Sequence, residues 1–143
     1  MKKLNILVLC TGNSARSQMA EALLRKHGGG RFDVYSAGTD PKGMNPYTVR
    51  AMAEAGIDVS AQRSKHLKEY LGTLDVHYLI IVCHGADQKC PAVWPGVSER
   101  MFWPFEDPAA CHGTDAEKLA KFREVRGEID AKVRAWLAEQ RAE

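Results

Sequence analysis

The sequence has 143 residues, 45% of them hydrophobic, which is enough to bury one core without disulfides or metals. Its 20 Lys and Arg against 18 Asp and Glu give a formal net charge of +2, too small an excess to suggest a nucleic-acid or membrane-surface protein. The apolar run before Cys10 is too short for a signal-peptide core or a transmembrane helix. We therefore expect a single cytoplasmic domain spanning residues 1–143.

The first part of the chain alternates strand and helix patterns. Leu4 to Leu9 is an almost continuous apolar run, typical of a strand buried on both faces of a parallel sheet. A helical pattern follows the loop after Cys10 and ends at residues 28–30, which are all glycine. Residues 32–36 are predicted to form a second strand.

The same alternation continues to the end of the chain. Asn45-Pro46 favours a helix start and Gly56 a helix end. Residues 76–82 and 100–105 are predicted to form a third and a fourth strand. Thr114 to Glu117 has the form of a capping box and opens the last helix. The inner face of that helix is predicted to carry Leu119, Phe122, Ile129, Val133 and Trp136.

Strands that alternate with helices predict the α/β class, here a single domain with a central four-stranded parallel sheet flanked by helices. Ligands of such sheets bind at the carboxyl ends of the strands. Cys10, Cys83 and the stretch around Asp107 all fall at or just beyond predicted strand ends. They could therefore share one site.

Four cysteines are expected to be thiols in a reducing compartment: Cys10, Cys83, Cys90 and Cys111. None forms a C-x-x-C pair, and no histidine lies at zinc-finger spacing, so a structural zinc site is not expected. Cysteines kept as thiols are either inert core residues or reactive groups. Their positions in the fold distinguish the two.

The segment from Cys10 to Ser17 has the form C-x5-R-S between the first strand and the first helix. Such a loop can point several backbone N–H groups inward, which forms a nest for an anion. Arg16 adds a planar fork of donors that matches two oxygens of a tetrahedral oxyanion. The same donors favour a Cys10 thiolate, to which Ser17 can donate a hydrogen bond. The alternative is a core cysteine beside a solvated arginine.

The motif therefore predicts that Cys10 is a nucleophile that attacks an oxyanion held in this loop. Gly12 lets the backbone turn and approach the ligand closely. The oxyanion-binding residues are predicted to be Thr11, Gly12, Asn13, Ser14, Ala15, Arg16 and Ser17.

This loop resembles the phosphate-binding loop of low-molecular-weight protein tyrosine phosphatases. The continuation from Gln18 to Glu21 resembles more closely the thioredoxin-coupled arsenate reductases of that superfamily, since the phosphatases usually have proline in place of Gln18. The similarity extends over Tyr35–Thr39, Asn45–Pro46, Ala55–Asp58, Cys83–Pro91, Asp107–Ala109 and the last helix. It implies the low-molecular-weight phosphatase fold and the reduction of arsenate to arsenite, for arsenic detoxification.

Cys83 and Cys90 would have no task in a phosphatase, but a reductase needs a thiol pair to supply two electrons. The resemblance implies a relay in which Cys10 attacks arsenate and Cys83 attacks the adduct and releases arsenite. Cys90 then attacks Cys83, and thioredoxin reduces the resulting Cys83–Cys90 disulfide. The alternative is a pair of packed cysteines at a strand end.

Asp107 matches the Asp-Pro general acid of the superfamily. An acid near Cys10 is expected because the departing oxygen must be protonated, although Asp-Pro is also a common turn. Phosphatases usually have an aromatic residue after Asp-Pro, whereas Ala109 and Ala110 follow here. Two alanines suit a small inorganic substrate, namely arsenate, with phosphate or sulfate as competing oxyanions.

Potassium-binding relatives use residues that match Asn13, Glu21, Ser36 and an acidic residue where this chain has Lys65. The ammonium could take the place of the cation, which speaks against a potassium requirement. We expect no metal and no tightly bound cofactor, thioredoxin as the partner, neither nucleic acid nor membrane, and a monomer. A phosphatase and a non-catalytic oxyanion or redox sensor are the alternative functions.

Overall fold

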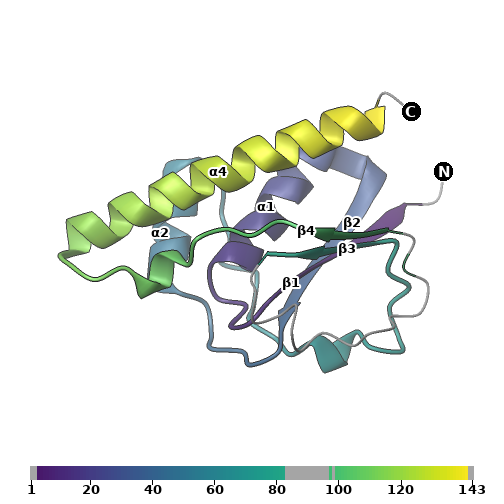
Figure 1. Cartoon of the computed structure of the whole chain (residues 1–143), viewed down its shortest axis with the longest axis horizontal. Coiled ribbons are helices and arrows are strands. Elements are labelled where there is room, and N and C mark those ends of the chain that lie inside the picture. Colours follow the sequence, from purple (N-terminus) through teal and green to yellow (C-terminus); the bar gives the residue numbers. More distant parts are fainter. Residues whose placement is uncertain (1–2, 83–96, 98, 142–143) are drawn as a thin grey trace.

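The computed structural model describes residues 3–82, 97 and 99–141. This part of the chain forms a four-stranded parallel sheet with three α-helices (Figure 1), which confirms the predicted fold class. The strands are β1 (Leu4–Cys10), β2 (Phe32–Gly38), β3 (Tyr78–Ile81) and β4 (Glu99–Phe102). The helices are α1 (Arg16–Gly28), α2 (Pro46–Glu54) and α4 (Asp115–Arg141), with short 3-10 helices at Gly29–Arg31, Leu67–Glu69 and Pro108–Ala110.

The strand order β2-β1-β3-β4 places β1 inside the sheet. Residues 6–9 are fully buried, as expected of an apolar strand covered on both faces. β1 pairs in parallel with both β2 and β3, and Cys10 lies opposite Gly38. Cys10 therefore ends a central strand at the edge of the sheet where ligands of α/β domains bind.

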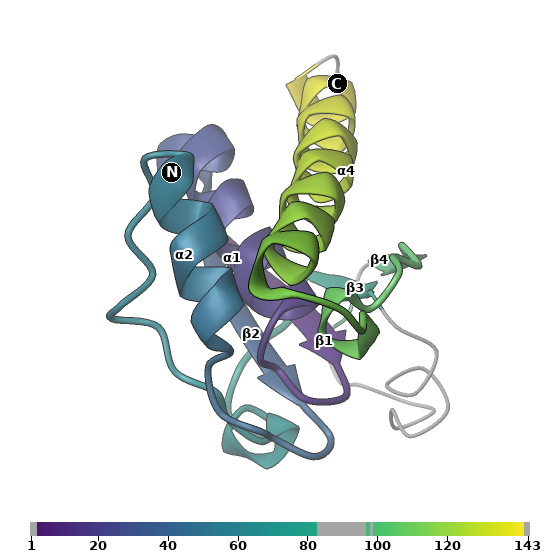
Figure 2. The same cartoon turned by 90° about the vertical axis from the view of Figure 1, so that its left-hand side faces the viewer.

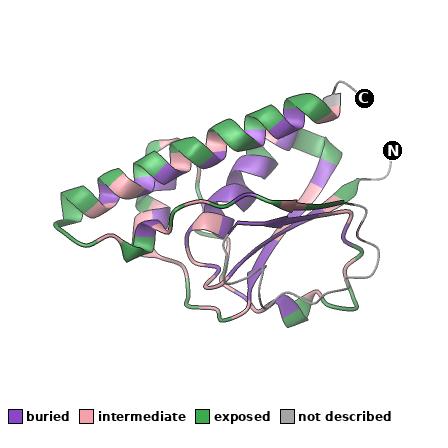
Figure 3. Cartoon of the chain, viewed as in Figure 1, coloured by how far each residue is buried: buried purple, intermediate pink, exposed green. Residues whose placement is uncertain are grey.

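The three helices gather on one face of the sheet, with α4 running across α1 and α2 (Figures 1 and 2). Figure 3 shows buried positions recurring along the inner side of α4. All five predicted inner-face residues of α4 are buried: Leu119, Phe122, Ile129, Val133 and Trp136. The ring of Trp136 packs against Phe32 and Tyr78, with centroid distances of 5.7 and 5.1 Å. None of the described helices is long and apolar enough to cross a membrane.

Element boundaries differ most at β4, where a strand over residues 100–105 is predicted. The observed strand ends at Phe102, although the Trp103 N–H still donates to the Ile81 carbonyl (2.8 Å) and the Phe105 N–H to the Val82 carbonyl (3.3 Å). The third strand is shorter than predicted, although Val82 continues the pairing through a hydrogen bond from its N–H to the Leu9 carbonyl (3.0 Å). The predicted helix starts are confirmed, because Asn45 caps α2 and Thr114 exchanges hydrogen bonds with Glu117.

The start of α2 is tied to the start of α4. Asp115 accepts hydrogen bonds from the Arg50 guanidinium and the Tyr47 hydroxyl, each 2.8 Å at the shortest. These bonds lower the pKa of Asp115 from 3.8 to about 2, so its carboxylate stays charged in all but strong acid. The link fixes the amino end of α2, which lies beside the site described next.

Candidate active site

Cys10 lies at one end of a surface hollow of about 300 Å³, and only 3% of the residue is exposed. The hollow brings together Cys10 and Arg16 of the loop with Asp107, which lies far from them in the sequence. Its full lining is Cys10, Thr11, Gly12, Ser14, Ala15, Arg16, Lys42, Asn45, Asp107 and Ala109. Among the predicted loop residues, Asn13 and Ser17 are fully buried and lie outside this lining.

The Cys10 sulfur lies within hydrogen-bonding distance of two groups of its own loop. The N–H of Asn13 donates to Sγ at 3.0 Å, and Ser17 Oγ lies 2.7 Å from it. Asn13 Nδ2 donates to Ser17 Oγ at 2.8 Å, which leaves the Ser17 hydroxyl proton to point at the sulfur. Two donors aimed at Sγ stabilise a thiolate over a thiol.

Asn13 shapes the bend of the loop. Its φ is +47°, in the left-handed region that asparagine tolerates better than most residues. Its side chain also donates to Ser36 Oγ at 3.0 Å, which links the loop to β2. Asn13, which is fully buried, thus provides the backbone turn of the loop and orients the Ser17 hydroxyl.

Helix α1 begins at Arg16 directly after this bend, and its N-cap is Ala15. Alanine has no side-chain acceptor for the first N–H groups of the helix, and no cap hydrogen bond is present. The positive end of α1 therefore remains available to an anion in the hollow.

Arg16 extends across the hollow toward the segment before Pro108. Its Nη1 donates to the Phe105 carbonyl at 3.1 Å, and its Nη2 lies 3.7 Å from Asp107 Oδ2. The Arg16 side chain is 14% exposed, against 44% for that of Asp107. Asp107 also accepts a hydrogen bond from the N–H of Ala109 at 3.0 Å, which orients its carboxylate at the mouth of the hollow.

Gly38 permits β2 to approach the loop this closely. A Cβ at this position would overlap the carbonyl oxygen of Thr11 and lie 3.1 Å from the Asn13 nitrogen. Any larger residue would push the loop away from the strand. The sequence points to Gly38 only through the motif Tyr35–Thr39.

A buried cation lies behind the loop. Lys65 Nζ donates to the Arg63 carbonyl at 2.8 Å and lies 3.5 Å from Ser36 Oγ and 3.9 Å from Glu21 Oε1. The Lys65 side chain is 7% exposed, and burial lowers its pKa from 10.5 while the charge of Glu21 opposes that shift. The ammonium therefore sits among a carbonyl, a hydroxyl and a carboxylate oxygen.

Several residues of the site are missing from the predicted set. Lys42 and Asn45 line the hollow, and nothing in the sequence marks Lys42. Gln18 appears in the sequence only as a departure from the phosphatases. In the structure its buried side-chain amide donates to both the carbonyl and the side-chain oxygen of Asn13 at 3.0 Å.

Two predicted catalytic residues, Cys83 and Cys90, lie outside the described residues. Their roles in the relay stay predictions. Cys111 is partly exposed and absent from the lining of the hollow, and its thiol lies 3.6 Å from the His112 carbonyl. The described residues contain no group of three or more His, Cys, Asp or Glu that could hold a metal ion.

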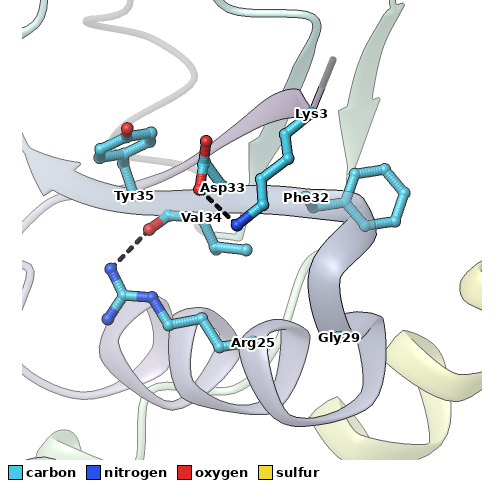
Figure 4. Close-up of a pocket in the computed structure, with 7 residues that line it drawn as sticks. All are labelled: Lys3, Arg25, Gly29, Phe32, Asp33, Val34 and Tyr35. Carbon is cyan, nitrogen blue, oxygen red and sulfur yellow. Dashed lines mark hydrogen bonds and ion pairs between the residues drawn. The ribbon is translucent and has the colours of Figure 1, made fainter. Parts of the chain in front are cut away.

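A second hollow lies along the outer edge of β2 (Figure 4). Its two cations already have protein acceptors. Arg25 donates to the Val34 carbonyl and pairs with Glu21, both at 2.6 Å, and Lys3 lies 3.5 Å from Asp33. Both cations of this second hollow are thus already paired within the protein.

Comparison with known proteins shows the family of the chain. The family model described as low molecular weight phosphotyrosine protein phosphatase matches residues 5–143. The chain belongs to this family. Within it, an arsenate reductase of Halalkalibacterium halodurans is 47% identical over 137 residues, which cover 95% of this chain and 96% of that protein.

Solved structures give the same picture of the family. An arsenate reductase in the phosphate-binding state matches with a TM-score of 0.79 and 31% identity, over 95% of this chain and 98% of that one. A thioredoxin-dependent arsenate reductase of Corynebacterium glutamicum matches with a TM-score of 0.73 and 28% identity. That match covers 99% of this chain and 64% of the other.

Proposed function

We propose that this protein is an arsenate reductase that converts arsenate to arsenite through Cys10, Cys83 and Cys90, with thioredoxin as the electron donor. The observation that carries the proposal is a buried cysteine whose sulfur meets the Asn13 N–H at 3.0 Å at the end of an anion-binding loop. The 47% identity to an arsenate reductase over nearly the whole chain supports arsenate as the oxyanion. We further propose a monomer working in the reducing cytoplasm.

In the first step the hollow holds the oxyanion, with oxygens toward the loop N–H groups and the Arg16 guanidinium. The Cys10 thiolate attacks arsenic, a sulfur–arsenic bond forms, and one oxygen departs as water. Asp107 is the proton donor that we assign to that oxygen, because its carboxyl group lies at the mouth of the hollow.

In the second step the Cys83 thiolate attacks Cys10 Sγ. A sulfur–sulfur bond forms, the sulfur–arsenic bond breaks, and its electron pair stays on arsenic, which leaves as arsenite. Cys90 then displaces Cys10 from Cys83, and thioredoxin reduces the Cys83–Cys90 disulfide. The hydrogen bond from the Val82 N–H to the Leu9 carbonyl supports a relay between Cys83 and Cys10, because the residues directly before these two cysteines lie side by side.

The direct test is arsenite production from arsenate by the purified protein with thioredoxin, thioredoxin reductase and NADPH. Hydrolysis of p-nitrophenyl phosphate in parallel measures the phosphatase alternative, of which we expect only a residual rate. If arsenite forms with glutaredoxin but not with thioredoxin, glutaredoxin takes the place of thioredoxin as the electron donor. If the protein hydrolyses the phosphoester rapidly and produces no arsenite from arsenate, it is a phosphatase and not an arsenate reductase.

Asp107→Asn should slow p-nitrophenyl phosphate hydrolysis about a hundredfold, the usual size of a general-acid contribution. The amide cannot give a proton to the departing oxygen, whereas its shape and the N-cap interaction with Ala109 are largely kept. Steady-state kinetics check this. Asp75→Asn is the control, because Asp75 lies just before β3 and does not line the hollow at Cys10. A rate within a few-fold of wild type would assign the proton to another group.

We also propose that potassium is dispensable, because the Lys65 ammonium already sits among the oxygens of Arg63, Ser36 and Glu21. Exchanging potassium for sodium at constant ionic strength should leave the melting temperature and the arsenate reduction rate unchanged. Thermal denaturation and the coupled assay in the two salts check this. A clear potassium-specific rise in either quantity would show that the chain binds the ion after all.

A further inference from the structure

The carbonyl groups of the oxyanion loop, from Cys10 to Ala15, all accept hydrogen bonds from residues outside the loop. Backbone N–H groups donate to the first three of these carbonyls. The donors to the Cys10, Thr11 and Gly12 carbonyls are the N–H groups of Thr39, Asp40 and Lys42, at 3.3, 2.9 and 2.9 Å respectively. The Gln18 amide reaches Asn13, the Asn45 N–H reaches Ser14 at 3.1 Å, and the Met19 N–H reaches Ala15 at 2.9 Å.

Two side-chain hydroxyls strengthen this arrangement. Thr48 is fully buried on α2, and its Oγ1 donates to the Ser14 carbonyl at 2.8 Å. Ser64 Oγ donates to the Gly12 carbonyl at 3.1 Å. Neither residue is among those that line the hollow, so neither touches a bound oxyanion directly.

A planar trans peptide points its C=O and its N–H in opposite directions. A donor that draws a loop carbonyl outward therefore turns the following N–H inward. The Gly12–Asn13 peptide shows this directly: its carbonyl accepts from Lys42 and Ser64, and its N–H meets Cys10 Sγ at 3.0 Å. The Ser14–Ala15 peptide is held in the same way by Asn45 and Thr48.

We infer that Thr48 and Ser64 are positioning residues, whose hydroxyls fix the directions of the Ala15 and Asn13 N–H groups that face the oxyanion and the Cys10 sulfur. This inference deepens the proposed function, because it concerns the same oxyanion site. It applies to any tetrahedral oxyanion held there, and inorganic phosphate is a sufficient probe.

The test uses Thr48→Val, which removes the hydroxyl and keeps the shape, together with Ser64→Ala. We expect Thr48→Val to weaken phosphate binding about five-fold, the effect of one lost hydrogen bond. Ser64→Ala should shift the pH dependence of Cys10 alkylation by iodoacetamide to higher pH. The reason is that the Ser64 hydroxyl steadies the Gly12–Asn13 peptide, whose N–H donates to the Cys10 sulfur. Phosphate titration by calorimetry and mass-spectrometric mapping of the Cys10 peptide across pH give the two readouts.

Two controls separate positioning from stability. Thr48→Ser restores the hydroxyl and should recover phosphate affinity. Thr73→Val removes a similar hydroxyl bond, to the Glu69 carbonyl at 3.0 Å, and should change neither readout. A lower melting temperature with unchanged phosphate affinity and Cys10 alkylation in both Thr48→Val and Ser64→Ala would overturn the inference. Both readouts use no arsenate, so they stand even where the wild type makes no arsenite.

Discussion

Cys10→Ser should abolish both arsenate reduction and phosphoester hydrolysis while the protein stays folded. Both reactions require the same thiolate at the end of β1, and a serine hydroxyl at this position remains protonated near neutral pH. The substitution changes one buried atom, and the Asn13 N–H and Ser17 Oγ can still hydrogen-bond the new oxygen. The coupled thioredoxin assay and p-nitrophenyl phosphate hydrolysis measure the two activities, and circular dichroism measures the fold.

Cys111→Ser is the matched control, because that cysteine is partly exposed and does not line the hollow. It should keep both activities. Substantial turnover by purified, correctly folded Cys10→Ser would show that Cys10 is not the nucleophile. Loss of activity in both variants would instead point to a general sensitivity of the fold to cysteine replacement.

Cys90→Ser should stop arsenate reduction after a single turnover, whereas Cys83→Ser should stop it before arsenite is released. In the proposed relay, loss of Cys90 leaves the Cys10–Cys83 disulfide without its resolving thiol, and we expect thioredoxin to reach that disulfide poorly. Without Cys83 no thiol is placed to attack the arsenic adduct on Cys10. Rapid-quench measurement of arsenite per enzyme and peptide mapping of disulfides distinguish the two stages.

Neither substitution should much affect p-nitrophenyl phosphate hydrolysis, which in the proposed mechanism needs only Cys10, Arg16 and Asp107. That activity is therefore the internal control for folding and for the loop. If wild-type protein makes arsenite while Cys83 and Cys90 are both recovered as free thiols, the three-cysteine relay is refuted. A reductase that uses an external thiol directly would then be the better description.

The sequence predicts the fold well because burial dominates it. Residues 4–9 are apolar except for Asn5, and the structure buries residues 6–9 at the center of a parallel sheet. Helix starts were predictable at Asn45 and Thr114 because their side chains cap backbone groups only two or three residues away. The end of β4 at Phe102 was missed, because the Trp103 and Phe105 N–H groups still donate to the segment that continues β3 and the change from strand to loop is gradual.

The loop of the site could be predicted from its own motif, but its support could not. Thr48 and Ser64 reach carbonyls that lie 34 and 52 positions earlier in the chain. Their acceptors are backbone oxygens, which every residue carries, so no pairing pattern in the sequence reveals the contact. The same holds for Gln18, whose identity suggested a branch of the family and not a bond to Asn13.

In the proposed mechanism the hollow recognises its ligand mainly through backbone N–H groups and one guanidinium, which favour a negative charge and a tetrahedral shape. Arsenate and phosphate share both, so binding alone gives the enzyme little means to tell them apart. Selectivity must then arise after binding, because arsenic can keep the electron pair of its bond to Cys10 and leave as arsenite, whereas phosphorus is not reduced. We therefore expect phosphate to compete with arsenate for the site, so that the rate of arsenate reduction depends on the ratio of the two anions and not on the amount of arsenate alone.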